Sequence, residues 1–218
     1  MLKNYLYKEL KQNLEFEPTA GQENLLKNLA EYLSLPGERE VFLLKGFAGT
    51  GKTTIVNALV RTLAGMKQQS VLLAPTGRAA KVLSSYTSRP AYTIHKKIYR
   101  QQSGKDGLGK FVLDRNLHKN AFFIVDEASM IGDRNYENAQ FGSGDLLGDL
   151  VSFIDKGSNC HLILIGDTAQ LPPVGLDISP ALNIRYLETL GLQVRESFLS
   201  DVLRQALGSG ILENATDL

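Results

Sequence analysis

The sequence predicts an α/β fold in which a mostly parallel β-sheet carries helices on both faces and a small hairpin is inserted. Short, continuously apolar runs alternate with helical patterns, as expected when both faces of a strand are covered. At 218 residues the chain is long enough for one large domain of this kind. A hydrophobic content of 43% and a charged content of 22% exclude the fibrous and disordered classes.

Apolar runs give the predicted strands, and the stretches between them give the predicted helices. The strands are expected at 41–44, 71–74, 122–125 and 162–165. The helices are expected at 22–33, 53–63, 78–84 and 145–154, with Gly65 as the C-terminal stop of the second helix. Two β-leaning segments, 98–100 and 110–113, flank a turn that holds Gly104, Gly107 and Gly109, which predicts a protruding hairpin.

Composition limits the partners and the location. A net charge of +1 gives no overall basic field, so any nucleic-acid contact must come from a local patch. The single cysteine, Cys160, excludes an internal disulfide. No apolar stretch approaches the length of a membrane span, and the N-terminus is charged and amphipathic rather than like a signal peptide. We therefore expect a cytoplasmic protein with no membrane partner.

Residues 46–53, Gly-Phe-Ala-Gly-Thr-Gly-Lys-Thr, match a phosphate-loop pattern between a strand and a helix. Glycines let successive backbone N–H groups turn inward, and the helix N-terminus adds positive potential. Lys52 brings a full charge to the β/γ-phosphates of ATP, and the Thr53 hydroxyl is a predicted Mg²⁺ ligand. The strand-helix context argues against a chance match. The predicted ATP-binding residues are Gly46, Ala48, Gly49, Thr50, Gly51, Lys52, Thr53 and Thr54.

Asp126 and Glu127 follow the predicted strand at 122–125, at the strand end where α/β proteins form ligand sites. Asp126 is predicted to hold Mg²⁺ through its water shell. Glu127 is predicted to orient or deprotonate the water that attacks the γ-phosphate. Taken alone, such a pair is as often a solvated turn, but the phosphate loop upstream favours the catalytic interpretation.

Three motifs in this order resemble those of superfamily 1 DNA helicases. Residues 74–81, Ala-Pro-Thr-Gly-Arg-Ala-Ala-Lys, resemble motif Ia, and residues 125–130, Val-Asp-Glu-Ala-Ser-Met, resemble motif II. Residues 163–175, with their Gln-Leu-Pro-Pro-Val ending, resemble motif III of the subgroup B branch that contains RecD, TraA and Dda. The resemblance covers about residues 16–214. It implies a RecA-like P-loop NTPase fold for residues 1–218, with a helical lead-in at 1–36.

The same resemblance implies roles for three further residues. Gln170 of motif III would touch the γ-phosphate and relay the nucleotide state to the DNA groove. Arg204, in a segment like motif IV, would neutralise charge that develops on the γ-phosphate, although a surface arginine on a helix is the alternative. Gln22 matches a glutamine that recognises adenine, but Thr19 to Gln22 is also a capping box, in which Gln22 bonds back to the Thr19 amide.

DNA contacts are implied at positions that resemble backbone-binding segments of the family, namely Pro75, Thr76, Arg78 and His95. A hydroxyl, a helix N-terminus and a neutral ring can each reach phosphates without reading the base sequence. His95 could equally be a core histidine. The hairpin at about 96–119 stands where this branch carries its inserted 1B pin, which splits the duplex, and a plain surface loop is the alternative.

The resemblance therefore implies the first motor domain, domain 1A, of an ATP- and Mg²⁺-dependent 5′-to-3′ DNA helicase or translocase that acts on single-stranded and duplex DNA. The second RecA-like domain, with motifs V and VI, is absent from the sequence and is expected as a partner in a longer protein. A nucleotide-dependent DNA- or protein-binding module without productive unwinding is one alternative. A P-loop small-molecule kinase is another, although it gives no reason for Gln-Leu-Pro-Pro at 170–173.

Overall fold

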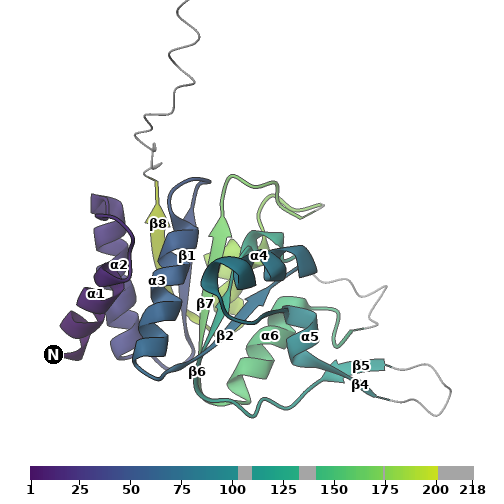
Figure 1. Cartoon of the computed structure of the whole chain (residues 1–218). Coiled ribbons are helices and arrows are strands. Elements are labelled where there is room, and N and C mark those ends of the chain that lie inside the picture. Colours follow the sequence, from purple (N-terminus) through teal and green to yellow (C-terminus); the bar gives the residue numbers. More distant parts are fainter. Residues whose placement is uncertain (103–109, 133–140, 174, 201–218) are drawn as a thin grey trace, which may run out of the picture.

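A computed structural model of the chain describes residues 1–102, 110–132, 141–173 and 175–200. A six-stranded sheet in the order β3-β2-β6-β7-β1-β8 forms its centre, as Figure 1 shows. Every neighbouring pair in this sheet is parallel. The strands are β1 (Glu40–Gly46), β2 (Gln69–Ala74), β3 (Ala91–Thr93), β6 (Lys119–Val125), β7 (Ser158–Asp167) and β8 (Gln193–Leu199). The predicted parallel α/β sheet is confirmed.

Two strands, β3 and β8, were not predicted from the sequence, and both lie at edges of the sheet. β3 has only three residues, and β8 carries exposed and half-buried polar residues between buried ones. An edge strand pairs on one side only and keeps polar side chains, so it shows no continuous apolar run. The four predicted strands, β1, β2, β6 and β7, are the interior ones.

The four predicted helices are present as α2 (Ala20–Ser34), α3 (Lys52–Gly65), α4 (Gly77–Thr87) and α6 (Leu146–Asp155). Other helical elements join them, namely α1 (Leu2–Gln12), α5 (Ile94–Ile98), α7 (Ile184–Thr189) and the 3₁₀ turns η1 (Ala128–Met130) and η2 (Pro180–Leu182). Gly65 is the last residue of α3 and not the left-handed residue beyond its end. Lys67 takes that conformation with φ 57°, and the Gln68 amide bonds to the Leu63 carbonyl at 2.8 Å. The prediction for Gly65 was therefore wrong.

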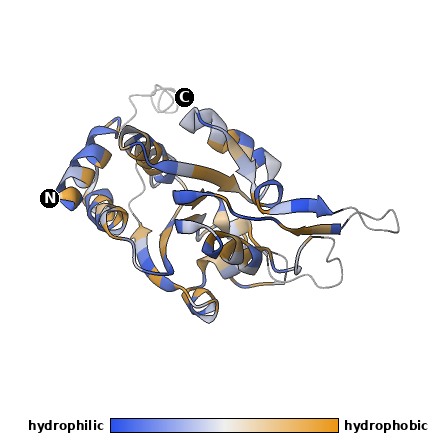
Figure 2. Cartoon of the chain, turned by 90° about the horizontal axis from the view of Figure 1, so that it is seen from below, coloured by the Kyte–Doolittle hydropathy of each residue, from blue (hydrophilic) through white to orange (hydrophobic). Residues whose placement is uncertain are grey.

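The sheet separates two hydrophobic cores, because alternate residues of each strand face opposite sides. Phe42, Ile124 and Ile163 pack with α1, α2 and α3. Leu43, Phe123 and Leu164 pack with α5 and α6 on the other side. Figure 2 shows hydrophobic residues along the strands and a mixture of hydrophobic and hydrophilic residues on the surrounding helices. This double burial produces the continuous apolar runs.

The predicted hairpin is confirmed as the antiparallel pair β4 (Tyr99–Gln102) and β5 (Lys110–Leu113). It projects from the body of the molecule beside α5 and α6 (Figure 1). The Tyr99 hydroxyl donates to Asp149 Oδ2 of α6 at 2.7 Å, and the Phe111 ring stacks on Phe141 at 4.4 Å between centroids. The base of the hairpin is therefore fixed to the domain. Its predicted turn, 103–109, lies outside the described residues.

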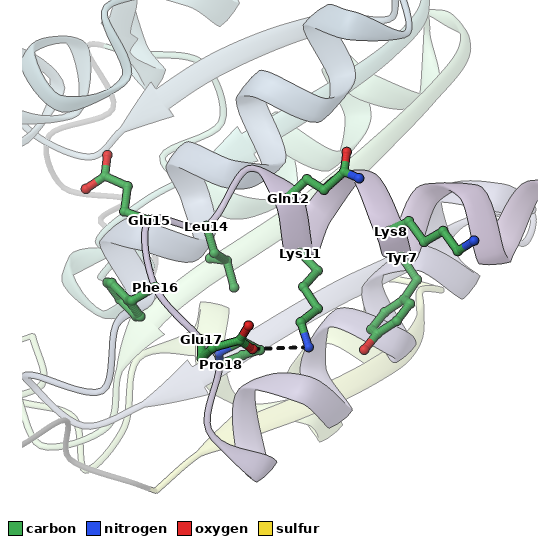
Figure 3. A pocket seen from close by; sticks show the side chains of 9 residues that line it. All are labelled: Tyr7, Lys8, Lys11, Gln12, Leu14, Glu15, Phe16, Glu17 and Pro18. Atoms are coloured by element: carbon green, nitrogen blue, oxygen red, sulfur yellow. Dashed lines mark ion pairs between the residues drawn. The ribbon is translucent and has the colours of Figure 1, made fainter.

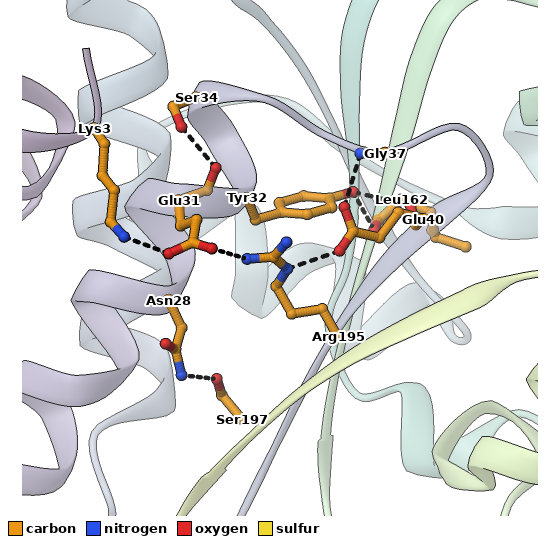
Figure 4. Close-up of polar contacts among 10 residues, drawn as sticks. All are labelled: Lys3, Asn28, Glu31, Tyr32, Ser34, Gly37, Glu40, Leu162, Arg195 and Ser197. Atoms are coloured by element: carbon orange, nitrogen blue, oxygen red, sulfur yellow. Dashed lines mark hydrogen bonds and ion pairs between the residues drawn. The ribbon is translucent and has the colours of Figure 1, made fainter. Parts of the chain in front are cut away.

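The N-terminal lead-in is a structural part of the domain. Arg195 of β8 contacts Glu40 at 2.7 Å and Glu31 of α2 at 3.2 Å, as Figure 4 shows. The buried Tyr32 hydroxyl donates to the Leu162 carbonyl of β7 at 2.9 Å. These bonds attach α2 to the sheet, and α1 packs on α2 and α3. In the described ranges, no helix combines the length and apolar character needed to cross a membrane.

Leu10→Ala tests whether α1 belongs to the core. Leu10 has 0% exposure, so its truncation should lower the free energy of unfolding by about 2–5 kcal/mol in urea denaturation. Leu2→Ala on the same helix is the control: Leu2 is 46% exposed, and the loss should stay within about 0.5 kcal/mol. Equal effects of the two substitutions would contradict the packing described for α1.

Candidate nucleotide and nucleic-acid site

The predicted phosphate loop leaves β1 at a crowded point between two neighbouring strands. Gly46 lies opposite Asp167 of β7 and Leu199 of β8. A Cβ added to Gly46 would lie 2.9 Å from the Leu199 carbonyl oxygen and 3.0 Å from Thr50 Oγ1. Gly49 and Gly51 have left-handed φ values of 76° and 91°. The loop can therefore follow this path only with glycine at these positions.

The loop is supported from beneath and open above. The buried Thr50 donates its hydroxyl to the Phe47 carbonyl at 2.8 Å, while residues 47–49 are exposed. Thr53 is exposed at the first turn of α3, and Thr54 is half-buried. The N-terminal end of α3 thus lies directly behind an exposed backbone loop. That arrangement suits a bound phosphate chain.

Lys52 is held at this loop by three oxygen atoms. Its Nζ donates to the carbonyls of Gly46 at 2.9 Å and Phe47 at 2.8 Å, and pairs with Asp167 Oδ2 at 3.1 Å. The Asp167 side chain is only 5% exposed and also accepts the Ala169 amide at 2.8 Å. Asp167 was given no role from its sequence context. Its position directly after an apolar strand, like that of Asp126, was the available signal.

Asp126 follows β6, and each of its carboxylate oxygens accepts a hydrogen bond. The Glu127 amide donates to Oδ1 at 2.9 Å, and the Tyr86 hydroxyl of α4 donates to Oδ2 at 2.7 Å. Burial, followed by the charge of Asp126, raises the pKa of Tyr86, so this hydroxyl stays protonated and can donate. Tyr86 was also missed, because nothing local marks a tyrosine 40 residues from its partner.

Glu127 and Gln170, which were each predicted to act at the γ-phosphate, lie in contact. Gln170 Nε2 donates to Glu127 Oε2 at 2.9 Å, and Gln170 Oε1 accepts the Ser129 hydroxyl at 2.8 Å. Glu127 adopts a left-handed φ of 55° where β6 turns into η1. The amide of Gln170 is thus held at both ends, with one end on the carboxylate predicted to activate water.

A cavity of about 420 Å³ joins these residues to the start of α4. Thr76 and Arg78 line it together with Asp126, Glu127 and Gln170, and Ala79, Val82, Met130 and Leu171 complete its wall. Thr76 caps α4 by accepting the Ala79 amide at 3.2 Å, which uses an oxygen lone pair and not the hydroxyl proton. Pro75 connects β2 to this cap. Three of the predicted DNA-contact residues therefore lie at or beside the cavity.

His95 lies apart from that cavity. Its half-buried ring is 5.1 Å from Phe141 and 5.8 Å from Tyr99 between centroids, in an aromatic cluster at the base of the hairpin. Burial lowers the pKa of His95, so the ring favours its neutral form. This is the surrounding of the core histidine that the sequence left open as an alternative.

Gln22 makes the capping box that the sequence allowed. Its side-chain Oε1 accepts the Thr19 backbone amide at 3.1 Å, and its backbone amide donates to Thr19 Oγ1 at 3.3 Å. The residue is 1% exposed, and its Nε2 also donates to the Thr50 carbonyl at 3.1 Å. Gln22 therefore connects α2 to the phosphate loop. Arg204 lies outside the described residues.

The donors present fit a magnesium-nucleotide pair. In the described ranges, no three His, Cys, Asp or Glu side chains gather into a metal-binding group. Asp126 and the Thr53 hydroxyl are the two oxygen donors predicted for Mg²⁺, which is usually held by one or two carboxylates together with water and substrate phosphates. A divalent cation at this site would therefore depend on phosphate oxygens from the nucleotide.

A second cavity of about 420 Å³ lies at the end of α1 and the connection to α2 (Figure 3). Its wall includes Phe16 and Pro18, and the Lys11 Nζ to Glu17 Oε2 pair at 3.3 Å crosses it. No phosphate-loop residue lines it. It is therefore separate from the site described above.

A family model described as an AAA domain matches residues 18–206. The chain is 29% identical to the ATP-dependent RecD2 DNA helicase of Deinococcus radiodurans, covering 92% of this chain and 25% of that protein. It is 30% identical to the ATP-dependent DNA helicase dda of Enterobacteria phage T4, covering 78% of this chain and 35% of that protein. The chain thus spans about a quarter to a third of the length of these relatives.

The fold is similar to that of the Bacteroides Pif1 helicase in a crystal structure with ADP-AlF3 and single-stranded DNA. The TM-score is 0.50 at 17% sequence identity, over 89% of this chain and 44% of the other. At this identity the likeness concerns the fold alone, and it confirms the RecA-like P-loop arrangement of the sheet and helices.

Gly46→Ala tests the close approach at the start of the loop. The added methyl group has no room beside the Leu199 carbonyl, so the free energy of unfolding should fall by about 1–3 kcal/mol in urea denaturation. Gly65→Ala is the control, because a Cβ there meets nothing within 4 Å and should stabilise α3 by about 0.5–1 kcal/mol. If Gly46→Ala left the free energy of unfolding unchanged, the loop would have more space than described.

Proposed function

We propose that this chain, which belongs to the AAA domain family, is the first ATP-dependent motor domain of a DNA helicase of the RecD and Pif1 type. The observation that carries the proposal is that Glu127 and Gln170 line the same cavity as Thr76 and Arg78. One group of residues has the chemistry for nucleotide hydrolysis, and the other has the chemistry for binding phosphates of a nucleic-acid backbone.

ATP would bind at the loop of residues 46–51, of which 47–49 are exposed, with Lys52 at its β/γ-phosphates. The crowding at Gly46 and the left-handed Gly49 and Gly51 support this placement, since a loop of this shape turns amide groups toward an anion. Thr53 and Asp126 would hold Mg²⁺, which would neutralise phosphate charge as the terminal phosphate leaves. Gln22, bonded to the loop at Thr50, would contact adenine.

Glu127 would orient or deprotonate the attacking water, and Gln170 would report the state of the nucleotide. Their hydrogen bond supports these roles. Gln170 donates to the Glu127 carboxylate at 2.9 Å, so a movement of one side chain would be transmitted to the other. Arg204 would add positive charge at the γ-phosphate. A second RecA-like domain of a longer protein would complete the cleft around the nucleotide.

DNA would be bound mainly through its backbone by Pro75, Thr76, Arg78 and the start of α4. The Thr76 hydroxyl proton and the helix N-terminus are donors suited to phosphate oxygens. His95, fixed in the aromatic cluster, would contribute through its neutral ring. We also propose 5′-to-3′ movement on single-stranded DNA, strand separation of duplex DNA with the hairpin as its pin, and a cytoplasmic location.

Substitutions at Lys52 and Glu127 should have different effects on ATP binding and on ATP hydrolysis. Lys52→Ala should weaken ATP binding by about 10- to 100-fold, because charged hydrogen bonds to the phosphates are lost. Glu127→Gln should keep ATP-Mg²⁺ binding, since glutamine can still accept from Gln170, and should slow hydrolysis by about 10²- to 10⁴-fold. Titration with a fluorescent ATP analogue and a phosphate-release assay measure the two effects.

A control is needed because Lys52→Ala leaves the buried Asp167 without its cation. Lys52→Ala with Asp167→Asn removes both charges and should restore the thermal midpoint without restoring ATP binding. Recovery of binding in the double variant would contradict the role of Lys52. Equal loss of binding and turnover in Glu127→Gln would contradict the division of roles between Asp126 and Glu127.

Hydrolysis should be stimulated by single-stranded DNA, with little dependence on base sequence. Binding of a labelled oligonucleotide should weaken steeply with salt, because backbone contacts release counterions. Thr76→Ala should weaken it modestly. Phosphate release with and without oligonucleotide tests the motor directly. DNA binding without any turnover would favour a nucleotide-dependent binding module, and phosphate transfer to a metabolite would favour a kinase.

A further inference from the structure

Tyr86 makes a contact that the proposed mechanism has not used. It lies in the last turn of α4, and its ring packs against the core formed with α1, α2 and α3. The hydroxyl does not end in solvent but donates to Asp126 Oδ2 at 2.7 Å. This bond joins two segments that are 40 residues apart, at the carboxylate with the chemistry for a divalent cation.

The structure assigns to Tyr86 the role of a positioning residue that holds Asp126 for the magnesium-nucleotide complex. The assignment rests on the proposed function, in which Asp126 serves Mg²⁺. Tyr86 does not touch the nucleotide or the metal in this role. It fixes the plane of the carboxylate that would hold Mg²⁺.

The two donors on Asp126 together fix its orientation. The Glu127 amide binds Oδ1 at 2.9 Å while the Tyr86 hydroxyl binds Oδ2, so rotation about the bond to the carboxylate would break both contacts. Each oxygen still has a free lone-pair direction, because a carboxylate offers about four acceptor sites. A cation or its bound water can therefore be received without breaking either bond.

Comparison with the neighbouring aspartate shows why the donor is a tyrosine. Asp167 is the last residue of the adjacent strand β7 and is neutralised by the ammonium of Lys52 at 3.1 Å. Both donors to Asp126 are neutral groups, a backbone amide and a phenol. Neutral donors orient a carboxylate and leave its negative charge available for Mg²⁺, whereas a lysine or arginine would cancel it. Second-sphere hydrogen bonds to metal-binding carboxylates serve this purpose.

Tyr86→Phe tests the assignment, since it removes the hydroxyl and keeps the ring in the core. The half-saturating Mg²⁺ concentration for binding of a fluorescent ADP analogue should rise about tenfold. Binding of the analogue without Mg²⁺ and the thermal midpoint should both stay close to the wild-type values. Tyr5→Phe, which removes a hydroxyl from a 51% exposed ring on α1, should change none of the three.

A double-variant cycle shows whether Tyr86 acts through Asp126. In an Asp126→Asn background, Tyr86→Phe should alter the Mg²⁺ requirement by less than about twofold, because the carboxylate it positions is already gone. A tenfold effect in that background would overturn the assignment. So would an unchanged Mg²⁺ requirement in Tyr86→Phe alone, or an equal loss of metal-free nucleotide binding, which indicates a merely structural role. If the wild-type chain does not bind the analogue at all, the proposed function falls and the assignment falls with it.

Discussion

The parallel register of β1 between β7 and β8 is the constraint on which the rest of the site depends. It places Gly46, Asp167 and Leu199 side by side at the carboxyl edge of the sheet. The space there is so limited that a single methyl group on Gly46 would touch the Leu199 carbonyl. Any shift of β1 by one residue would reverse the faces of its side chains and move the phosphate loop away from Asp167.

Adjacent strands then supply complementary chemistry. The cation Lys52 comes after β1, the counter-charge Asp167 ends β7 and the amide of Gln170 follows it, and two carboxylates, Asp126 and Glu127, come after β6. In the sheet, β7 lies between β6 and β1. The amide of Gln170 reaches across from the β7 loop to Glu127 after β6. Because parallel strands end at the same edge, residues separated by more than 100 positions meet there.

The parts of this arrangement that are local in the chain were predictable from the sequence. Continuous apolar runs predicted the interior strands because burial on both faces leaves a direct trace in composition. The spacing of Thr19 and Gln22 gave a capping box as the alternative to adenine recognition, and the structure contains that box. The edge strand β8 left no such trace, because Arg195 and Glu196 occupy it. Lys67 gave no sign that it would take the left-handed position at the end of α3.

Contacts between distant segments were not predictable in the same way. Asp167 and Tyr86 are ordinary residues by type, and their importance comes from the partners that the fold places beside them. The family resemblance implied roles for both Glu127 and Gln170 at the γ-phosphate, but not that Ser129 would bind Gln170 from the other side. Tertiary geometry decides these contacts, and a single sequence contains no direct record of it.

The oxygen cage around Lys52 has a consequence for how tightly a nucleotide can be held. The ammonium already contacts two carbonyls and one nearly buried carboxylate. A phosphate group that engages Lys52 therefore competes with Asp167 for one cation, so the net affinity is a difference between two ion pairs and not the full strength of the new one. The displaced carboxylate would also repel the phosphate that replaced it. Under the proposed function, this exchange of counter-ions would keep nucleotide binding reversible.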